Sequence, residues 1–203
     1  MSNWWMGADI YHGNNADMKV AAATLKFILM KTSQDTDFVD DMFKTRYNLA
    51  KTYKLPVGPY HFLEAKTASE GVAEAKFFNS LLKKYGYGTG DIIPSCDMEA
   101  GATYAGATAF ITEVKKVWGK AMLYCSASVV PDGWCGADAL WVAQYGPDKP
   151  DTVKYPNARK WSIWQSTDGK DGIEPHSLPG LGPCDVDWFR AGLLGRNFKK
   201  ITL

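Results

Sequence analysis

Residues 91–99 read Asp-Ile-Ile-Pro-Ser-Cys-Asp-Met-Glu, a short apolar run that ends in two acidic residues. The first six residues are typical of a short buried strand with a proline near its start. Alternate side chains of a strand point to the same face, so Asp97 and Glu99 are expected to share a side, with backbones about 6.5–7 Å apart. Two such carboxylates repel each other, and burial raises the pKa of the less solvated one. The pair therefore predicts a proton donor beside a stabilising anion, the combination that hydrolysis of a glycosidic bond requires.

The same motif also fits two surface acids at the end of a strand, because Asp-x-Glu is common. The motif alone does not distinguish a catalytic pair from two surface acids, so the other segments of the sequence are needed.

Strand-like and helix-like segments alternate through the first part of the chain. Apolar residues recur at helical spacing in three stretches, residues 39–53, 73–85 and 110–117. Such alternation predicts parallel strands covered by helices. Beyond Tyr124, strands expected at residues 140–145 and 161–166 are joined by stretches rich in Gly, Pro and Asp. The pattern indicates an α/β fold, a single irregular TIM-like β/α barrel with regular βα units in its first half and shortened or missing helices in its second.

Composition restricts the class of protein. The chain has 203 residues, of which 46% are hydrophobic and 22% charged, enough apolar material for one well-buried domain. A net charge of +1 without any basic block argues against nucleic acid or an anionic membrane as a partner. Aromatic residues make up 13%, including eight Trp, and flat rings serve both as core filler and as walls of sugar-binding clefts.

The four cysteines show neither C-x-x-C spacing nor a zinc-ligand pattern. We expect Cys96 and Cys125 to be buried thiols in strands. Cys135 could form a disulfide with Cys125 or with Cys184, and the sequence does not decide this.

The sequence predicts no metal and no cofactor. The three histidines are scattered, with no two at helical ligand spacing, and His61 is expected to be a hydrogen-bonded residue of the barrel. Neither a Gly-rich phosphate loop nor a Gly-x-Ser-x-Gly elbow is present.

Eight motifs occur in order along nearly the whole chain: Gly7–Ile10, Phe27–Thr32, Leu55–Phe62, Asp97–Glu99, Leu123–Tyr124, Leu140–Tyr145, Trp164–Gln165 and Asp185–Phe189. In this order they resemble the Chalaropsis-type lysozymes, glycoside hydrolase family 25. The resemblance implies a peptidoglycan hydrolase, an N-acetylmuramidase that cleaves the β-1,4 bond between N-acetylmuramic acid and N-acetylglucosamine. It implies that residues 1–203 form one catalytic domain of the family's shortened barrel, without a separate wall-binding domain.

Three sites depart from the family's usual pattern. They are Tyr11-His12-Gly13-Asn14, Thr32-Ser33-Gln34-Asp35 and Asp187, where the family often has asparagine. We expect all three at the rim of the site, where they would affect substrate detail more than the reaction.

The resemblance also implies the catalytic residues. In parallel β/α barrels the chemistry lies at the carboxyl ends of the strands, where these residues are expected. Glu99 corresponds to the general acid and Asp97 to its partner carboxylate. Asp9 and Asp185 would complete an acidic floor that tunes those two, although each also fits a cap at a strand end.

Seven further residues are candidates for substrate binding. The aromatic ones would form the walls of a sugar cleft, Lys31 would offset the negative charge, and Gln165 would bind an acetamide. Each aromatic residue fits the barrel core equally well, because strand residues alternate in and out. The candidates are Lys31, Tyr60, Phe62, Tyr124, Trp141, Trp164 and Gln165.

Two alternatives to a muramidase stay open. One is a chitin-directed glycosidase, because the departures at Tyr11 and Asp35 could change recognition of the lactyl group. The other is a catalytically silent sugar-binding or phage structural protein on the same fold. The four acidic residues disfavour the silent protein, since binding alone does not require all of them.

Residues 1–6 lack a basic segment followed by an apolar stretch, so no secretion signal is expected. No apolar run approaches the ~20 residues that span a bilayer. We expect synthesis in the cytoplasm and action on the bacterial cell wall after release, as a phage endolysin passing through membrane holes or as an injected effector. The expected partner is the glycan strand of peptidoglycan, and the expected oligomeric state is a monomer.

Overall fold

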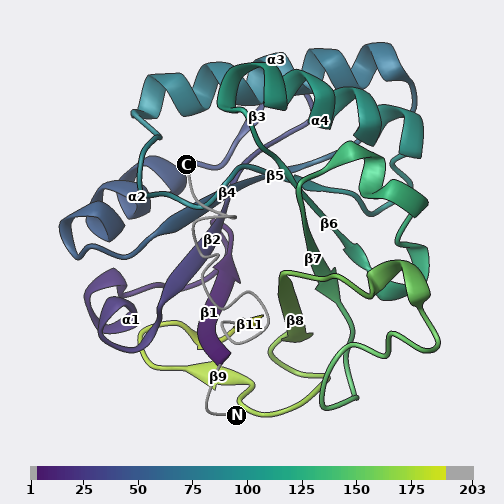
Figure 1. Ribbon diagram of the computed structural model, residues 1–203. Coiled ribbons are helices and arrows are strands. Elements are labelled where there is room, and N and C mark those ends of the chain that lie inside the picture. Colours follow the sequence, from purple (N-terminus) through teal and green to yellow (C-terminus); the bar gives the residue numbers. More distant parts are fainter. Residues whose placement is uncertain (1–3, 191–203) are drawn as a thin grey trace.

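The computed structural model describes residues 4–190 (Figure 1). Its centre is a closed barrel of eight strands in the order β1-β11-β8-β7-β6-β5-β4-β2, closed by pairing of β1 with β2. The barrel strands are β1 (Trp4–Ile10), β2 (Phe27–Gln34), β4 (Val57–Phe62), β5 (Ser95–Asp97), β6 (Met122–Ser126), β7 (Ala139–Ala143), β8 (Ile163–Thr167) and β11 (Asp185–Arg190). The α/β barrel predicted from the sequence is therefore confirmed.

Helices cover the outside of the first half of the barrel (Figure 1). They are α1 (Met18–Thr24), α2 (Phe43–Thr52), α3 (Ala68–Tyr85) and α4 (Tyr104–Trp118). The other elements of the described chain are three two-residue strands, β3 (Phe38–Val39), β9 (Ser177–Leu178) and β10 (Gly182–Pro183), and three 3₁₀ turns, η1 (Ala127–Val129), η2 (Asp132–Gly136) and η3 (Pro156–Ala158). Only 3₁₀ turns connect β6 to β7 and β7 to β8, which confirms the irregular second half.

Local sequence explains where the long helices begin and approach each other. At the start of α3, the Thr67 side chain accepts from the Glu70 N–H while Glu70 reaches back to the Thr67 backbone, a capping box. The helix ends at Gly86, whose φ of 71° is left-handed. A Cβ at Gly71 would lie 2.2 Å from the carbonyl oxygen of Gly106 in α4, so glycine at this position permits the close packing of α3 on α4.

The direction of the last strand corrects the expectation of a fully parallel barrel. β11 runs antiparallel to both β1 and β8. Asp185 therefore stands at the amino end of its strand, not at the carboxyl end as its motif suggested. The reversal nevertheless brings Asp185 to the same edge of the barrel as the carboxyl end of β1, where it lies opposite Asp9.

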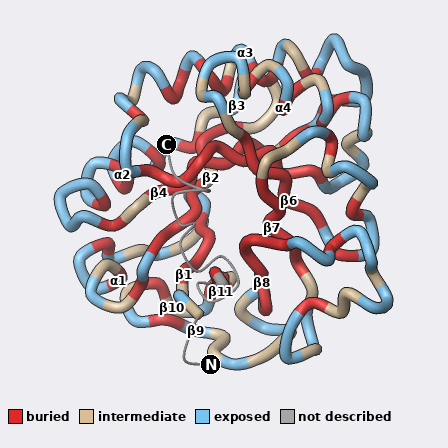
Figure 2. The backbone as a smooth tube through the Cα atoms, in the orientation of Figure 1, coloured by how far each residue is buried: buried red, intermediate tan, exposed pale blue. Residues whose placement is uncertain are grey.

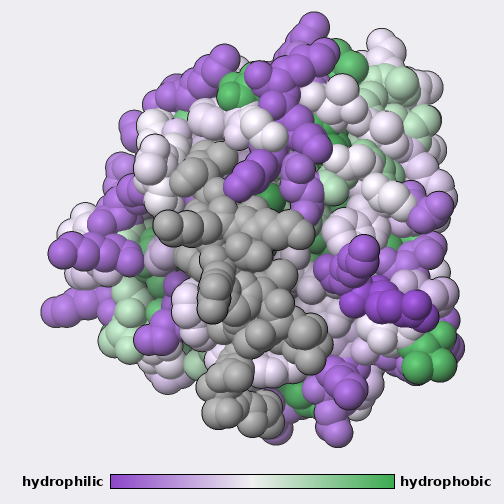
Figure 3. Space-filling view, in the orientation of Figure 1, coloured by the Kyte–Doolittle hydropathy of each residue, from purple (hydrophilic) through white to green (hydrophobic). Residues whose placement is uncertain are grey.

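Apolar side chains form one layer inside the barrel wall and one layer outside it, so almost all of the wall is buried (Figure 2). One buried cluster lies inside the barrel and includes Phe27, Leu29 and Trp141. A larger cluster includes the alternate residues Ile28 and Met30 together with the apolar faces of the helices. On the face drawn in Figure 3, hydrophilic side chains predominate around the edge and hydrophobic ones form small separate groups.

All four cysteines are buried free thiols, which confirms the expectation for Cys96 and Cys125 and leaves Cys135 without a disulfide. No helix in the described part of the chain is long and apolar enough to cross a membrane. Residues 1–3 and 191–203, which the expected single domain also includes, lie outside the described residues.

Candidate active site

A cavity of about 260 Å³ opens at the barrel edge where Asp9, Asp97 and Asp185 meet. Ten of the eleven residues predicted for the site line it, and they come from all eight strands of the barrel and the loop after β5. The lining consists of Asp9, Tyr11, Asn14, Lys31, Tyr60, Phe62, Asp97, Glu99, Tyr124, Trp141, Gln165 and Asp185.

Trp164 is the predicted residue that the structure does not place in the cavity. It precedes Gln165 in β8, and because neighbouring residues in a strand point to opposite faces, Gln165 faces inward and Trp164 outward. The Trp164 ring is buried against Trp4, with centroids 5.6 Å apart, and its Nε1 donates to the Gln144 carbonyl at 2.8 Å. The prediction of Trp164 as a cleft wall is therefore wrong.

Asp97 and Glu99 lie at different depths of the same cavity. Asp97 ends β5 and is only 4% exposed, whereas Glu99 is exposed at the mouth. Backbone hydrogen bonds continue beyond β5 on both sides, from Leu63 N–H to the Asp97 carbonyl and from Met98 N–H to the Tyr124 carbonyl, each 2.9 Å. The extended backbone places both carboxyls toward the cavity.

The surroundings raise the pKa of both carboxyls. Burial raises the pKa of Asp97 well above its usual range, the Glu99 charge raises it further, and Lys31 opposes the change. Loss of solvent raises the pKa of Glu99 as well, again opposed by Lys31. The two groups titrate as a pair, so the pair holds a proton to higher pH than isolated carboxyls would. Among the described residues, Asp97 Oδ1 has no hydrogen-bond partner, which leaves it available to a substrate.

Gln165 organises the opposite side of the cavity. Its Nε2 donates to Asp9 Oδ2 at 2.7 Å and to Asp185 Oδ2 at 3.2 Å. Its Oε1 accepts from the hydroxyls of Tyr124 at 2.9 Å and Tyr145 at 2.7 Å. These four contacts use both ends of the carboxamide and fix its orientation. Gln165 therefore supports the acidic floor, rather than offering a free amide group as the sequence suggested.

A third aspartate lies behind this floor. Asp187 is fully buried, and its Oδ1 accepts from Trp141 Nε1 at 2.7 Å. Burial raises the pKa of Asp187 and of Asp9, and a neighbouring carboxylate adds to each, Asp185 for Asp187 and Asp187 for Asp9. Burial and the neighbouring Asp9 raise the pKa of Asp185 to about 9. The floor therefore retains protons that exposed aspartates would lose.

Two of the departures from the family pattern lie deeper than expected. Asp187 is beneath the cavity, not at its rim, and Ser33 is fully buried. The Ser33 hydroxyl lies 2.8 Å from Nδ1 of His61, whose Nε2 lies 2.9 Å from Glu74. The expectation for His61 as a hydrogen-bonded barrel residue is confirmed, and these departures change internal contacts rather than the rim.

Lys31 is the basic side chain of the cavity lining. Its Nζ donates to Gln34 Oε1 at 2.5 Å and lies 4.5 Å from the centre of the Phe62 ring. Burial lowers the pKa of Lys31, while Asp97 and other acidic neighbours oppose the change. Lys31 therefore lies close enough to the carboxyl pair to interact with its charge, and its role in substrate binding stays a prediction.

Sequence reasoning did not identify Tyr11 and Asn14 as residues of the site. The signal was the unusual Tyr11–Asn14 segment, which was expected at the rim with an effect on substrate detail, without any of its residues being named as candidates for binding. Within residues 4–190, no three His, Cys, Asp or Glu side chains are arranged to hold a metal ion. The expectation that no cofactor is needed stays a prediction.

A sequence model of the family described as "Glycosyl hydrolases family 25" matches residues 8–172, most of the chain and nearly all of the cavity lining. The chain belongs to this family. A curated relative, Lysozyme M1 of Streptomyces globisporus, is 25% identical over 189 residues, which cover 82% of this chain and 63% of the relative. The chain thus spans less than two thirds of that lysozyme.

Two solved structures show the same fold at low sequence identity. The CTP1L endolysin aligns with a TM-score of 0.78 and 24% identity over 96% of this chain and 69% of its own. A family 25 glycosyl hydrolase from Bacillus anthracis aligns with a TM-score of 0.75 and 20% identity over 98% of this chain and 94% of its own. The irregular barrel is therefore the fold of family 25 members.

Proposed function

We propose that the chain is a lysozyme that hydrolyses the β-1,4 bond between N-acetylmuramic acid and N-acetylglucosamine in peptidoglycan. The observation that carries the proposal is the difference in depth between Asp97, buried in the cavity, and Glu99, exposed at its mouth. A general acid must reach a glycosidic oxygen at the entrance, and a stabilising carboxylate must lie beneath the sugar ring. Family membership and the lysozyme relative support the same reaction.

Glu99 acts as the general acid in this mechanism. It donates its proton to the leaving oxygen while positive charge develops on the sugar in the cavity. Asp97 stabilises that charge, either directly or by orienting the N-acetyl group of the substrate. The raised pKa of Glu99 keeps it protonated to higher pH than a glutamate that is free in water.

Glu99 also borders two hollows outside the acidic cavity. One, of about 530 Å³, includes Tyr104 and Val129, and the other, of about 430 Å³, includes Tyr145 and Tyr155. The sugar that receives positive charge fits the acidic cavity, and the leaving part of the glycan fits the open rim beyond Glu99. A site that continues on the surface suits a polymer, whose chain extends past the bond that is cut.

The biological setting belongs to the same proposal. The chain acts on bacterial cell walls as a monomer, after release through membrane holes or by injection, without nucleic acid or membrane as a partner. The structural likeness to an endolysin supports this setting.

Analysis of the digestion products tests the reaction. Purified peptidoglycan is digested, reduced with borohydride and examined by mass spectrometry. A muramidase produces fragments with reduced N-acetylmuramic acid at the new end, whereas reduced N-acetylglucosamine would contradict the assignment. Chitin oligosaccharides in parallel test the alternative substrate, and the Glu99→Gln protein provides the inactive control. Lysis by wild type also excludes a silent sugar-binding protein.

A further inference from the structure

The turn Tyr11–Asn14, between β1 and α1, forms one wall of the cavity, and the mechanism above gives it no role. Tyr11 and Asn14 line the cavity, and Tyr11 is 47% exposed. An exposed aromatic ring beside a polar cavity is available to pack on a ligand. The turn also departs from the usual pattern of the family, so its contribution is a property of this chain.

Contacts within the turn fix the Asn14 side chain, and Gly13 leaves room for the Tyr11 ring. The Asn14 N–H donates to the Tyr11 carbonyl at 3.0 Å, and the Tyr11 N–H donates to Asn14 Oδ1 at 2.9 Å. The Asn14 oxygen is thereby used, so its NH₂ group remains to meet a ligand. The Tyr11 ring lies across Gly13, where a Cβ would come within 2.6 Å of two ring carbons. Glycine at position 13 therefore allows this ring position.

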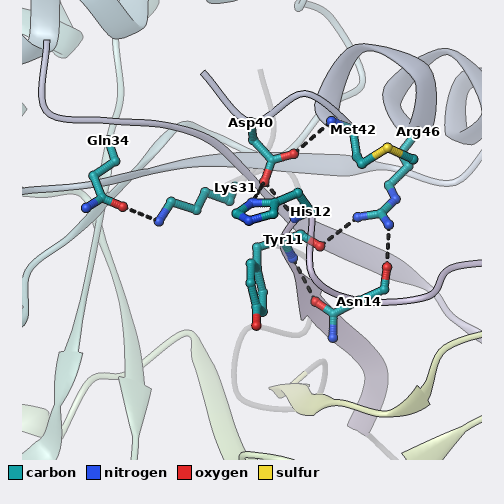
Figure 4. A network of polar contacts seen from close by, with 8 residues as sticks. All are labelled: Tyr11, His12, Asn14, Lys31, Gln34, Asp40, Met42 and Arg46. Atoms are coloured by element: carbon teal, nitrogen blue, oxygen red, sulfur yellow. Dashed lines mark hydrogen bonds and ion pairs between the residues drawn. The ribbon is translucent and has the colours of Figure 1, made fainter. Parts of the chain in front are cut away.

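Two buried side chains from outside the turn hold its backbone (Figure 4). Arg46 of α2, 5% exposed, donates from Nη1 to the Tyr11 carbonyl at 2.7 Å and from Nη2 to the Asn14 carbonyl at 2.5 Å. Asp40, 2% exposed, accepts from the His12 N–H at 2.7 Å and from Met42 N–H at 3.0 Å. Figure 4 shows the Tyr11 ring directed away from the guanidinium that holds its carbonyl.

The forked guanidinium is suited to fixing two acceptors at once. Moving a charged group from water into the protein interior is unfavourable unless it forms hydrogen bonds there. Arg46 forms two, with the carbonyls at the two ends of the turn. The turn is consequently held in one conformation before any substrate arrives. Preorganisation of this kind reduces the entropy lost on binding.

We propose that Tyr11 and Asn14 bind the pyranose ring that enters the acidic cavity, and that Arg46 is the residue that positions them. The proposal rests on the lysozyme activity proposed above. The Tyr11 ring would pack on the apolar face of the sugar, and the Asn14 NH₂ would donate to a hydroxyl or acetamide oxygen. The contact is made before and during the reaction alike, so its loss raises KM more than it lowers kcat.

The experiment measures new reducing ends released from uncrosslinked peptidoglycan strands as a function of substrate concentration. Tyr11→Ala is expected to raise KM about tenfold and to change kcat by less than about threefold. Gly13→Ala, an exposed change that displaces the Tyr11 ring, should give a similar rise. Arg46→Lys, which can serve only one carbonyl well, should raise KM in the same way. Asn15→Ala, an exposed neighbour outside the cavity lining, is the matched control with wild-type constants.

The double variant Tyr11→Ala/Gly13→Ala separates the proposed contact from a general disturbance. If Gly13→Ala acts through the ring, it has no further effect once the ring is removed, so the two effects are not additive. Additive effects, or wild-type KM in Tyr11→Ala, would overturn the proposal. If Arg46→Lys fails to fold, the exposed Gly13→Ala still decides. Absence of cleavage by wild type would instead overturn the lysozyme activity.

Discussion

Asp9 and Asp185 face each other across the seam where β1 meets β11, and the carboxamide of Gln165 donates to both carboxyls, at 2.7 and 3.2 Å. The two residues come from opposite ends of the chain. Two facing carboxylates repel each other, and Gln165 relieves only part of this repulsion with its two N–H groups. Burial is the main cause of the raised pKa of both groups, and Asp9 raises the pKa of Asp185 further while Asp187 raises that of Asp9 further. The seam therefore depends on protons as well as on strand pairing.

Asp185→Asn tests this relationship. The folded pKa is about 9 and an unperturbed aspartate titrates near ~3.9, so between those values the folded state binds more protons than the unfolded state. The free energy of unfolding of wild type therefore falls as pH rises through this window, and the asparagine variant loses this contribution. We expect a gain in Tm over wild type that is larger at pH 8 than at pH 5. Turnover should fall about tenfold, a loss of ~1.4 kcal/mol of transition-state stabilisation.

Wild-type turnover in Asp185→Asn would remove Asp185 from the site. Loss of folding would favour its alternative role as a cap at the strand end.

Asp187→Asn makes a second, independent change behind the floor. Asparagine keeps an oxygen for Trp141 Nε1 and removes a carboxyl whose pKa burial raises. The folded wild type retains this proton where the unfolded chain releases it, so the wild type loses stability as pH rises and the variant does not. The Tm of the variant relative to wild type should therefore increase between pH 5 and 8. Asp148→Asn, which removes an exposed charge, is the control with little change. A Tm difference from wild type that does not grow with pH would show that Asp187 is not protonated in the folded state.

The sequence predicted the barrel and most of the cavity because the residues next to a short apolar segment are enough to show that it is a strand and where it ends. Asp97 and Glu99 follow a short apolar strand, and that neighbourhood alone places them at the edge of a sheet. Trp141 and Trp164 show the limit, since each lies in a strand but only the barrel register decides which face it occupies. The alternation in Asp185–Phe189 is the same in a parallel and an antiparallel strand, so the reversal of β11 was not predictable. The hydrogen bond from Arg46 to the Tyr11 carbonyl was not predictable either, because it joins residues that are far apart in the sequence.

Metal independence is the third prediction. No cluster of metal-ligating side chains is formed by residues 4–190, and the proposed acid catalysis needs none. Wall suspensions treated with wild type should lose turbidity at the same rate with and without EDTA. A loss in EDTA that zinc or magnesium restores would refute the prediction, and a zinc-dependent lytic enzyme treated in parallel confirms that the chelator acted.

Glu99→Gln and Asp97→Asn test the division of labour between the two carboxyls. Removal of the general acid should reduce lysis of intact walls by about 10²–10⁴-fold. Asp97→Asn should also be severe, because it removes the charge beneath the sugar while keeping the size of the side chain. Since Glu99 must be protonated, wild-type activity should decline as pH rises through the raised pKa of the pair. A folded Glu99→Gln protein that clears walls near the wild-type rate would overturn the assignment.

The stereochemical course is the last prediction, and we expect retention of configuration at the new reducing end. Asp97 lies beneath the cavity with Oδ1 free of partners among the described residues, so it can face the sugar carbon or the substrate's acetamide without a water between them. Retaining enzymes place their carboxyls about 5–5.5 Å apart, whereas inverting enzymes leave about 6.5–9.5 Å for an attacking water. Asp97 and Glu99 are two residues apart on one extended segment, which permits the shorter separation.

Proton NMR of a soluble glycan during the first minutes of digestion distinguishes the outcomes. The β-anomer appearing first supports a double displacement by Asp97 or by the acetamide. The α-anomer appearing first would mean direct attack by water, and Asp97 would then have to act as a base.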